Sequence, residues 1–216
     1  MRGTHKFCGI VLILGAAMTA RSASSSRPNS QLTVYVSDSA NTPGRSLFDA
    51  EHEAARIFKN AGIAVEWVNC SSSAHPSRDS RCHQTPGPGE FAVRVVPRAR
   101  QAPSTVFGTS FLGPSGGVYA DVFFDRVRQL RDIDPNLSVA PILGDVIAHE
   151  LGHLLLGENS HTHTGLMQPS WQYPQLRLIE MGHLQFDASE AARLRERLEV
   201  LRSNACVSPQ GPTAGP

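Results

Sequence analysis

The spacing of apolar side chains in the first third of the chain predicts a strand, a helix and a second strand. Apolar residues at Leu32, Val34 and Val36 alternate with polar ones, which is typical of a strand. Apolar residues recur with helical spacing over 46–60, and a second strand follows over 63–68. This order indicates a right-handed crossover that joins two parallel strands.

The rest of the chain yields further elements, and no internal repeat or second domain is visible. Strands are expected over 91–96 and 118–124, a short charged helix over 125–134, a strongly apolar helix over 139–156, and a last helix over 188–201, capped by Asp187 or Ser189. The segments 101–117 and 168–174 read as a loop and an irregular turn. We therefore expect an α+β fold with a mixed, twisted sheet of about four strands.

The apolar helix over 139–156 contains His149-Glu150-Leu151-Gly152-His153, a match to H-E-x-x-H. Residues four apart lie on one helical face, so His149 and His153 can reach one zinc ion, which needs a third protein ligand. Glu150 is placed to take a proton from a zinc-bound water. The alternative is a core helix with two incidental histidines, but burying them without partners would be costly.

The third ligand is expected after the helix, where Gly157 permits a left-handed stop. His161 is the first imidazole after that stop and is our preferred ligand. His163 is the main rival and Glu180 a more distant one. Residues two apart in an extended segment point to opposite sides, so only one of His161 and His163 should bind.

These residues resemble the metzincin clan of zinc peptidases, whose pattern is H-E-x-x-H-x-x-G-x-x-H followed by a methionine turn. The chain departs from that pattern: Gly157 comes one residue late, and Asn159 stands where the third histidine would be. Met167 would be the turn methionine. The resemblance covers about twenty-five residues and implies a divergent, metzincin-like zinc metallopeptidase with a single zincin-like domain, an active-site helix and a C-terminal helix.

The same resemblance suggests residues that support the substrate. In metzincin-like peptidases the strand before the active-site helix is often an edge that pairs with extended substrate. Here that strand would be 118–124, which carries Tyr119; an ordinary edge strand is the alternative. Trp171 and Tyr173 could line a pocket. Tyr173 could donate to a developing oxyanion, although packing beneath the site is the favoured interpretation, and His163 is a further support residue.

The N-terminus and the cysteines predict an exported protein. Residues 1–23 have the positive start, short apolar run and small residues of a cleaved signal peptide. A linker over 24–30, a peptidase-like domain over 31–202 and a disordered tail over 203–216 follow. A secreted or periplasmic location is oxidising, so Cys70 and Cys82 should form a disulfide, which leaves Cys206 unpaired.

With a net charge of +1, the sequence lacks the excess of positive charge that is typical of proteins that bind nucleic acid or associate stably with an anionic membrane. We expect a monomer that acts on peptides or proteins. The predicted function is a secreted zinc endopeptidase in which Glu150 activates the water. Two alternatives are a zinc hydrolase of a non-peptide amide and an inert secreted module that binds zinc for structure. An intact Glu150 argues against the inert module, since a structural site needs no base.

Overall fold

The computed structural model describes residues 30–72, 77–99, 102–113 and 116–207. The predicted signal peptide and nearly all of the linker lie outside these residues. Five strands and five α-helices follow one another in the order β1 (Gln31–Asp38), α1 (Gly44–Asn60), β2 (Ala64–Ser72), a short 3-10 helix (Ser80–His83), β3 (Glu90–Val96), β4 (Gly108–Gly113), β5 (Gly116–Phe123), α2 (Phe124–Ile133), α3 (Val139–Leu156), α4 (Tyr173–Glu180) and α5 (Ala188–Val207).

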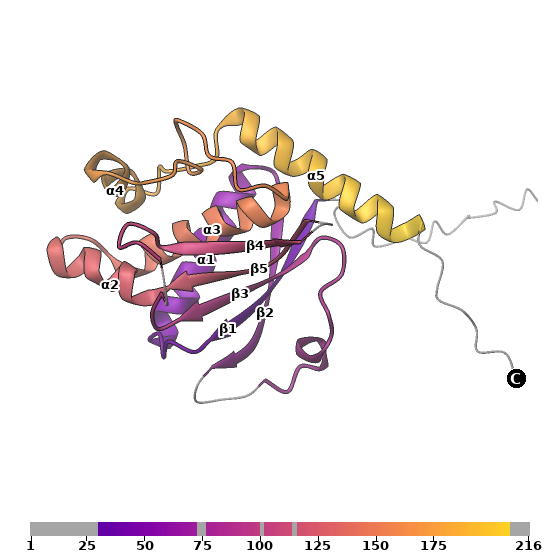
Figure 1. Ribbon diagram of the computed structural model, residues 1–216, viewed down its shortest axis with the longest axis horizontal. Coiled ribbons are helices and arrows are strands. Elements are labelled where there is room, and N and C mark those ends of the chain that lie inside the picture. Colours follow the sequence, from indigo (N-terminus) through magenta and orange to yellow (C-terminus); the bar gives the residue numbers. More distant parts are fainter. Residues whose placement is uncertain (1–29, 73–76, 100–101, 114–115, 208–216) are drawn as a thin grey trace, which may run out of the picture.

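The strands form one mixed sheet in the order β2-β1-β3-β5-β4 (Figure 1). Strands β1, β2, β3 and β5 are parallel, and β4 alone runs antiparallel, paired to β5. The predicted crossover from β1 through α1 to β2 is confirmed, as is the α+β class. The sheet has one strand more than expected, because β4 occupies a segment that the sequence indicated as loop.

The position of β5 corrects a second expectation. Residues 118–124 were expected at the edge of the sheet, but β5 pairs with β3 on one side and β4 on the other. The edge strand beside α3 is β4. Any strand addition on this side of the sheet must therefore use β4.

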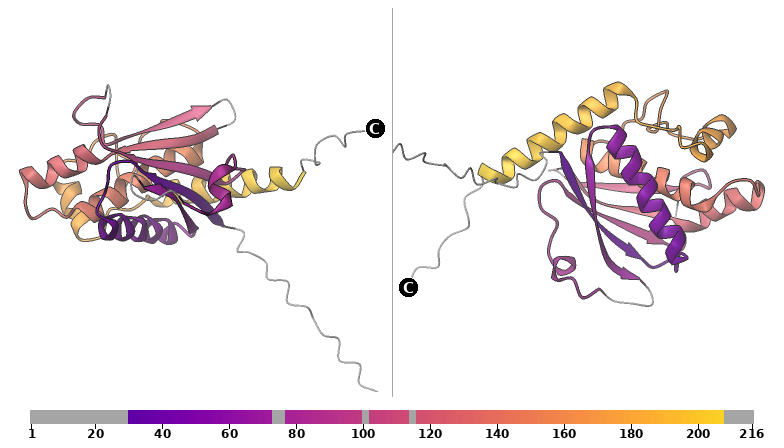
Figure 2. Two further views of the ribbon diagram at one scale, coloured as in Figure 1. Left: turned by 90° about the horizontal axis from the view of Figure 1, so that it is seen from below. Right: turned by 180° about the vertical axis from the view of Figure 1, so that it is seen from behind.

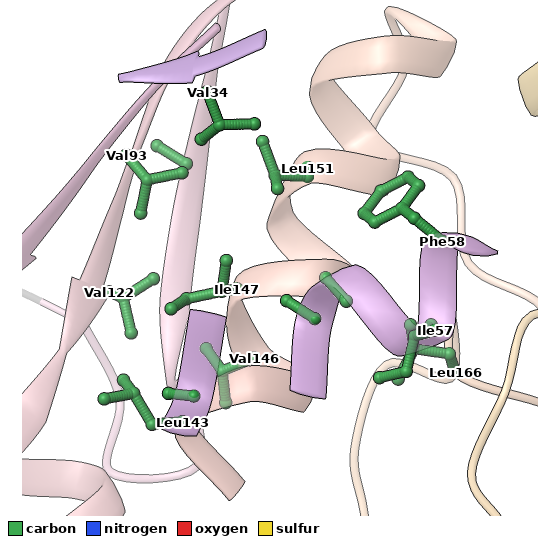
Figure 3. Close-up of a cluster of buried hydrophobic side chains, with 14 of the residues drawn as sticks. Val34, Ile57, Phe58, Val93, Val122, Leu143, Val146, Ile147, Leu151 and Leu166 are labelled. Carbon is green, nitrogen blue, oxygen red and sulfur yellow. The ribbon is translucent and has the colours of Figure 1, made fainter. Parts of the chain in front are cut away.

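Helices α1 and α3 lie side by side on one face of the sheet and enclose the core with it (Figures 1 and 2). Inward side chains of the central strands meet one face of α3, and α1 contributes the other wall. Residues that build this contact include Val34, Val93, Val122, Ile147, Leu151, Ile57 and Phe58 (Figure 3). Helix α3 has the length and apolar composition of a membrane span, but its residues from Ile142 to Leu155 are buried in the domain. Its apolarity therefore reflects burial on all sides.

Helix α4 and the C-terminal end of helix α5 differ from the expectation. Residues 173–180 form α4, whose first turn has a capping box made by Gln172 and Gln175. Helix α5 continues through Val207, so the first residues of the segment 203–216 are helical rather than part of a disordered tail. Residues 208–216 lie outside the described part of the chain.

The expected disulfide is present between Cys70, near the end of β2, and Cys82, in the 3-10 helix. It fastens the segment after β2 to the sheet. An ion pair between Arg81 and Glu66 of β2 supports the same attachment.

Removing this disulfide is expected to lower the free energy of unfolding. The bridge closes a segment of 12 residues, for which chain entropy gives about 3 kcal/mol. Urea unfolding of the variant with both Cys70→Ser and Cys82→Ser should show that loss of free energy. A reductant should lower the free energy of unfolding of the wild type but not that of the variant. Equal free energies of unfolding for the two proteins would contradict this account.

Candidate metal centre

Two histidines of α3 face each other beneath the surface. His149 and His153 stand one turn apart, are buried, and bring their Nε2 atoms to 3.1 Å. The opposite ring nitrogen of each faces a backbone carbonyl oxygen: Nδ1 of His149 lies 2.9 Å from that of Leu166, and Nδ1 of His153 lies 3.0 Å from that of Glu158.

These contacts set the chemistry of the pair. A carbonyl oxygen only accepts, so each Nδ1 carries the hydrogen and each Nε2 presents a lone pair. Burial lowers the pKa of His149 to about 3 and that of His153 to about 4, which keeps both rings neutral. Two lone pairs that face each other at this distance repel, and a cation between them would remove the repulsion. The donor set therefore fits a metal ion.

His161 completes the cluster. It lies on the segment 157–167, which we call the ligand loop and which begins at Gly157, the left-handed C-cap of α3 (φ 72°). His161 is exposed, and its ring centroid is 4.8 Å from that of His153 and 5.5 Å from that of His149. One ring nitrogen from each histidine lies within 4.8 Å of the others.

The two rival ligands lie elsewhere. His163 is exposed and outside this cluster. Glu180, at the end of α4, accepts a hydrogen bond from the backbone N–H of Ser138 at 2.6 Å. Of the three candidates named from the sequence, the structure brings only His161 to the pair on α3.

Glu150 lies beside the histidines but is buried against the edge strand. Its Oε2 is 2.7 Å from Oγ of Ser110, an inward side chain of β4. Burial raises the pKa of Glu150 to about 7, and the hydrogen bond from Ser110 opposes that shift. A carboxylate held in one orientation next to this histidine cluster is suited to accept and return a proton near neutral pH.

Sequence reasoning missed Ser110 because it placed the whole segment 101–117 in a loop. The sequence offers little to identify this strand, because its buried residues Gly108 and Ser110 are small or polar while the apolar Phe111 is exposed. The run is brief and contains glycines, so period-two spacing alone gives a weak strand signal.

Gly108 is required by the close approach of β4 to Glu150. A Cβ atom at Gly108 would lie 2.6 Å from Oε1 and 2.7 Å from Cγ of Glu150. Gly108→Ala is therefore expected to displace the carboxylate and reduce kcat on the order of 100-fold, as small misplacements of reacting groups do. Metal content, measured alongside turnover, should not change.

The matched control is Gly113→Ala on the same strand, where the added Cβ would come no closer than 3.7 Å to its neighbours. It should keep wild-type turnover. Normal turnover in Gly108→Ala would contradict the assigned role of Glu150.

A cavity of about 230 Å³ opens over the cluster. One wall is aromatic: Phe107 and Trp171 stack with ring centroids 6.4 Å apart, and Trp171 also meets the edge of His149. The indole N–H of Trp171 donates to the carbonyl oxygen of Leu166, which also accepts from His149. Trp171 lines this cavity, as the sequence suggested.

Comparisons with known proteins support the fold. No family model and no curated protein matches the sequence. Among solved structures, the chain is similar to a zinc-dependent peptidase from Methanocorpusculum labreanum, at 15% identity and a TM-score of 0.52, covering 74% of this chain and 99% of that one. Metalloproteinase-II from Bacteroides fragilis matches at 12% identity and a TM-score of 0.48, covering 78% of this chain and 53% of that one.

The likeness to the first structure establishes the fold. At 15% identity, the functions of individual residues cannot be transferred from that structure, so they are argued from the geometry described above.

The remaining residues named from the sequence divide into one at the site and two away from it. Met167 is buried beneath the motif, where a Cβ at Gly152 would meet its sulfur at 2.7 Å. Tyr173 was expected to pack under the site but is 64% exposed at the start of α4, outside the cavity lining. Tyr119 is paired with Phe111 of β4 and stacked on it, and it is not among the residues that line the cavity.

Proposed function

We propose that this protein is a secreted zinc-dependent peptidase in which Glu150 is the general base. The observation that carries the proposal is the placement of Glu150, a buried carboxylate held by Ser110 beside three converging imidazoles. The likeness of the fold to a solved zinc-dependent peptidase supports it.

His149, His153 and His161 would hold the metal. Three neutral imidazoles are a donor set that suits zinc and leave one coordination position open, which is the arrangement of catalytic rather than structural sites. When bound there, zinc supplies a Lewis acid that polarises a substrate carbonyl and acidifies water.

Glu150 then carries the proton. It accepts a proton from the attacking water, whose hydroxyl bonds to the carbonyl carbon, and returns the proton to the leaving amine as the C–N bond breaks, so that one water is consumed for each peptide bond. Ser110 keeps the carboxylate oriented during both transfers. The aromatic wall formed by Phe107 and Trp171 gives an apolar side chain of the substrate a place beside the metal.

The substrate would lie along β4. Among the described residues this strand has no sheet neighbour on its outer side, and its inward residues Gly108 and Ser110 line the cavity. An extended peptide can add to such an edge through main-chain hydrogen bonds, which would bring its carbonyl groups past Glu150. We propose this edge in place of the one expected from the sequence.

Export is part of the proposal. The disulfide between Cys70 and Cys82 supports it, because disulfides persist in oxidising compartments. Detection of the protein in the medium or periplasm, with the residues before about position 24 removed, is the expected result. Retention of the whole chain in the cytoplasm would contradict it.

The function is tested by offering two substrate classes to the zinc-loaded full chain. One class is a set of unfolded proteins and peptides, with cleavage sites read by mass spectrometry, and the other is a set of small N-acyl amides. Cleavage of internal peptide bonds is expected. Hydrolysis of the small amides alone would favour the non-peptide alternative, and hydrolysis of neither would leave only a binding module.

A further inference from the structure

The ligand loop touches all three histidines of the cluster. Its residue Glu158 provides the carbonyl oxygen for His153, its residue Leu166 provides the one for His149, and His161 lies between them. The geometry of the whole centre therefore depends on what fixes this loop in place.

The loop is fastened to the start of α5. Oγ1 of Thr162 lies 2.6 Å from Oε1 of Glu190, and the backbone N–H of Leu166 donates to the carbonyl oxygen of Gln185 at 2.7 Å. Gly165, with φ of 74°, passes so close that a Cβ there would lie 3.2 Å from Oε2 of Glu190 and 3.0 Å from the oxygen of Gln185. The backbone of the loop thus rests directly on the carboxylate.

Glu190 also belongs to the N-terminal cap of α5. Oδ1 of Asp187 accepts from the backbone N–H of Glu190, and the backbone N–H of Asp187 donates to Oε2 of Glu190 at 2.7 Å. This reciprocal pair is a capping box and uses one carboxylate oxygen. The other oxygen is left for Thr162. The Glu190 side chain is only 1% exposed, so both oxygens must find partners inside the protein.

We infer that Glu190 is a positioning residue for the metal centre, because its carboxylate fixes Thr162 and thereby the orientation of the adjacent ligand His161. This inference rests on the proposed function of the cluster. A second contact between the same elements, the ion pair of Arg193 with Glu158, is exposed and contributes little. Residues that orient metal ligands from outside the coordination sphere typically change metal affinity 10–100-fold.

Thr162→Val tests the inference most cleanly. It removes the hydroxyl, keeps the shape of the side chain and leaves the capping box untouched. Zinc affinity of the full chain, measured by competition with a chelating dye, is expected to fall 10–100-fold. The melting temperature should fall as well, because Oε1 of Glu190 is left buried without its partner; the affinity is therefore compared with that of a variant that loses stability alone. The spectrum of the cobalt-substituted protein should change with it, since the orientation of one ligand is released.

Asp187→Ala is the matched control, because it removes the side-chain cap of α5 and leaves the contact between Glu190 and Thr162. It should lower the melting temperature and keep wild-type zinc affinity. Glu190→Gln should also keep wild-type zinc affinity. The amide oxygen of glutamine can accept from the backbone N–H of Asp187, and its N–H can donate to the hydroxyl of Thr162. The hydrogen of that hydroxyl can then go to the carbonyl oxygen of Thr164, 2.8 Å away. Glu190→Ala should lose both stability and affinity.

The outcomes separate the inference from the proposal beneath it. Wild-type affinity in Thr162→Val overturns the inference, while loss of zinc in His161→Ala would still support the proposed centre. Equal losses of affinity in Thr162→Val and Asp187→Ala would reduce Glu190 to a structural role. A wild-type chain that binds no zinc overturns both.

Discussion

Glu150→Gln is expected to lower kcat for peptide hydrolysis by about 10²–10⁴-fold, the range that general acid–base catalysis supplies, and to leave zinc bound. Glutamine keeps the shape of the side chain and can still accept a hydrogen bond from Ser110 through its amide oxygen. It cannot take a proton from water near neutral pH. The loss should therefore fall on the chemical step and not on the fold or the metal.

Metal content and turnover of the same preparation are the measurements. Glu180→Gln is the matched control, since it makes the same chemical change at a carboxylate that contacts Ser138 and lies outside the cluster. It should keep both zinc and turnover. If Glu150→Gln hydrolyses peptides at the wild-type rate, the base has been assigned to the wrong residue.

His161→Ala is expected to weaken zinc binding by more than the 10–100-fold that loss of an outer-shell partner costs. Removing a ligand takes away a metal bond and opens the centre to solvent. His163→Ala should bind zinc as the wild type does, because His163 is exposed and lies outside the cluster. Titration of the two variants side by side gives the comparison.

The pair of variants is decisive because the two histidines lie on the same short loop and differ only in what they face. Full affinity in His161→Ala, together with a large loss in His163→Ala, would reverse the assignment. Equal and partial losses would show that the loop exchanges the two ligands.

The sequence was sufficient for the elements whose signals are local. The helix that carries the motif was predicted over 139–156 and is observed with those bounds, because a continuous apolar run ends at a glycine that adopts the left-handed conformation. The parallel pairing of β1 and β2 followed from the order of strand, helix and strand. The spacing of the motif also predicted that His149 and His153 lie together, and the structure brings them together with His161; the role of Glu150 as the base stays a prediction.

What the sequence could not supply depends on contacts between distant residues. Strand β4 is short and contains two glycines, and it is defined by its pairing to β5 and its contact with Glu150. The role of the ligand loop depends on Glu190, which is 28 residues beyond Thr162. Tyr119 was named because β5 was expected to be an edge strand, and the neighbours of a strand are decided by contacts between distant segments rather than by its residue types.

The central claim, that zinc at this histidine cluster performs peptide hydrolysis with Glu150, is tested most directly by titrating zinc into metal-free protein. The full chain is stripped with a chelator, zinc is added in small steps, and the rate of cleavage of one peptide is recorded at each step. The account predicts a rate that rises in proportion to bound zinc, levels off at one equivalent, and stays near zero throughout for Glu150→Gln. A rate that does not depend on zinc, or no cleavage at full zinc occupancy, would contradict it.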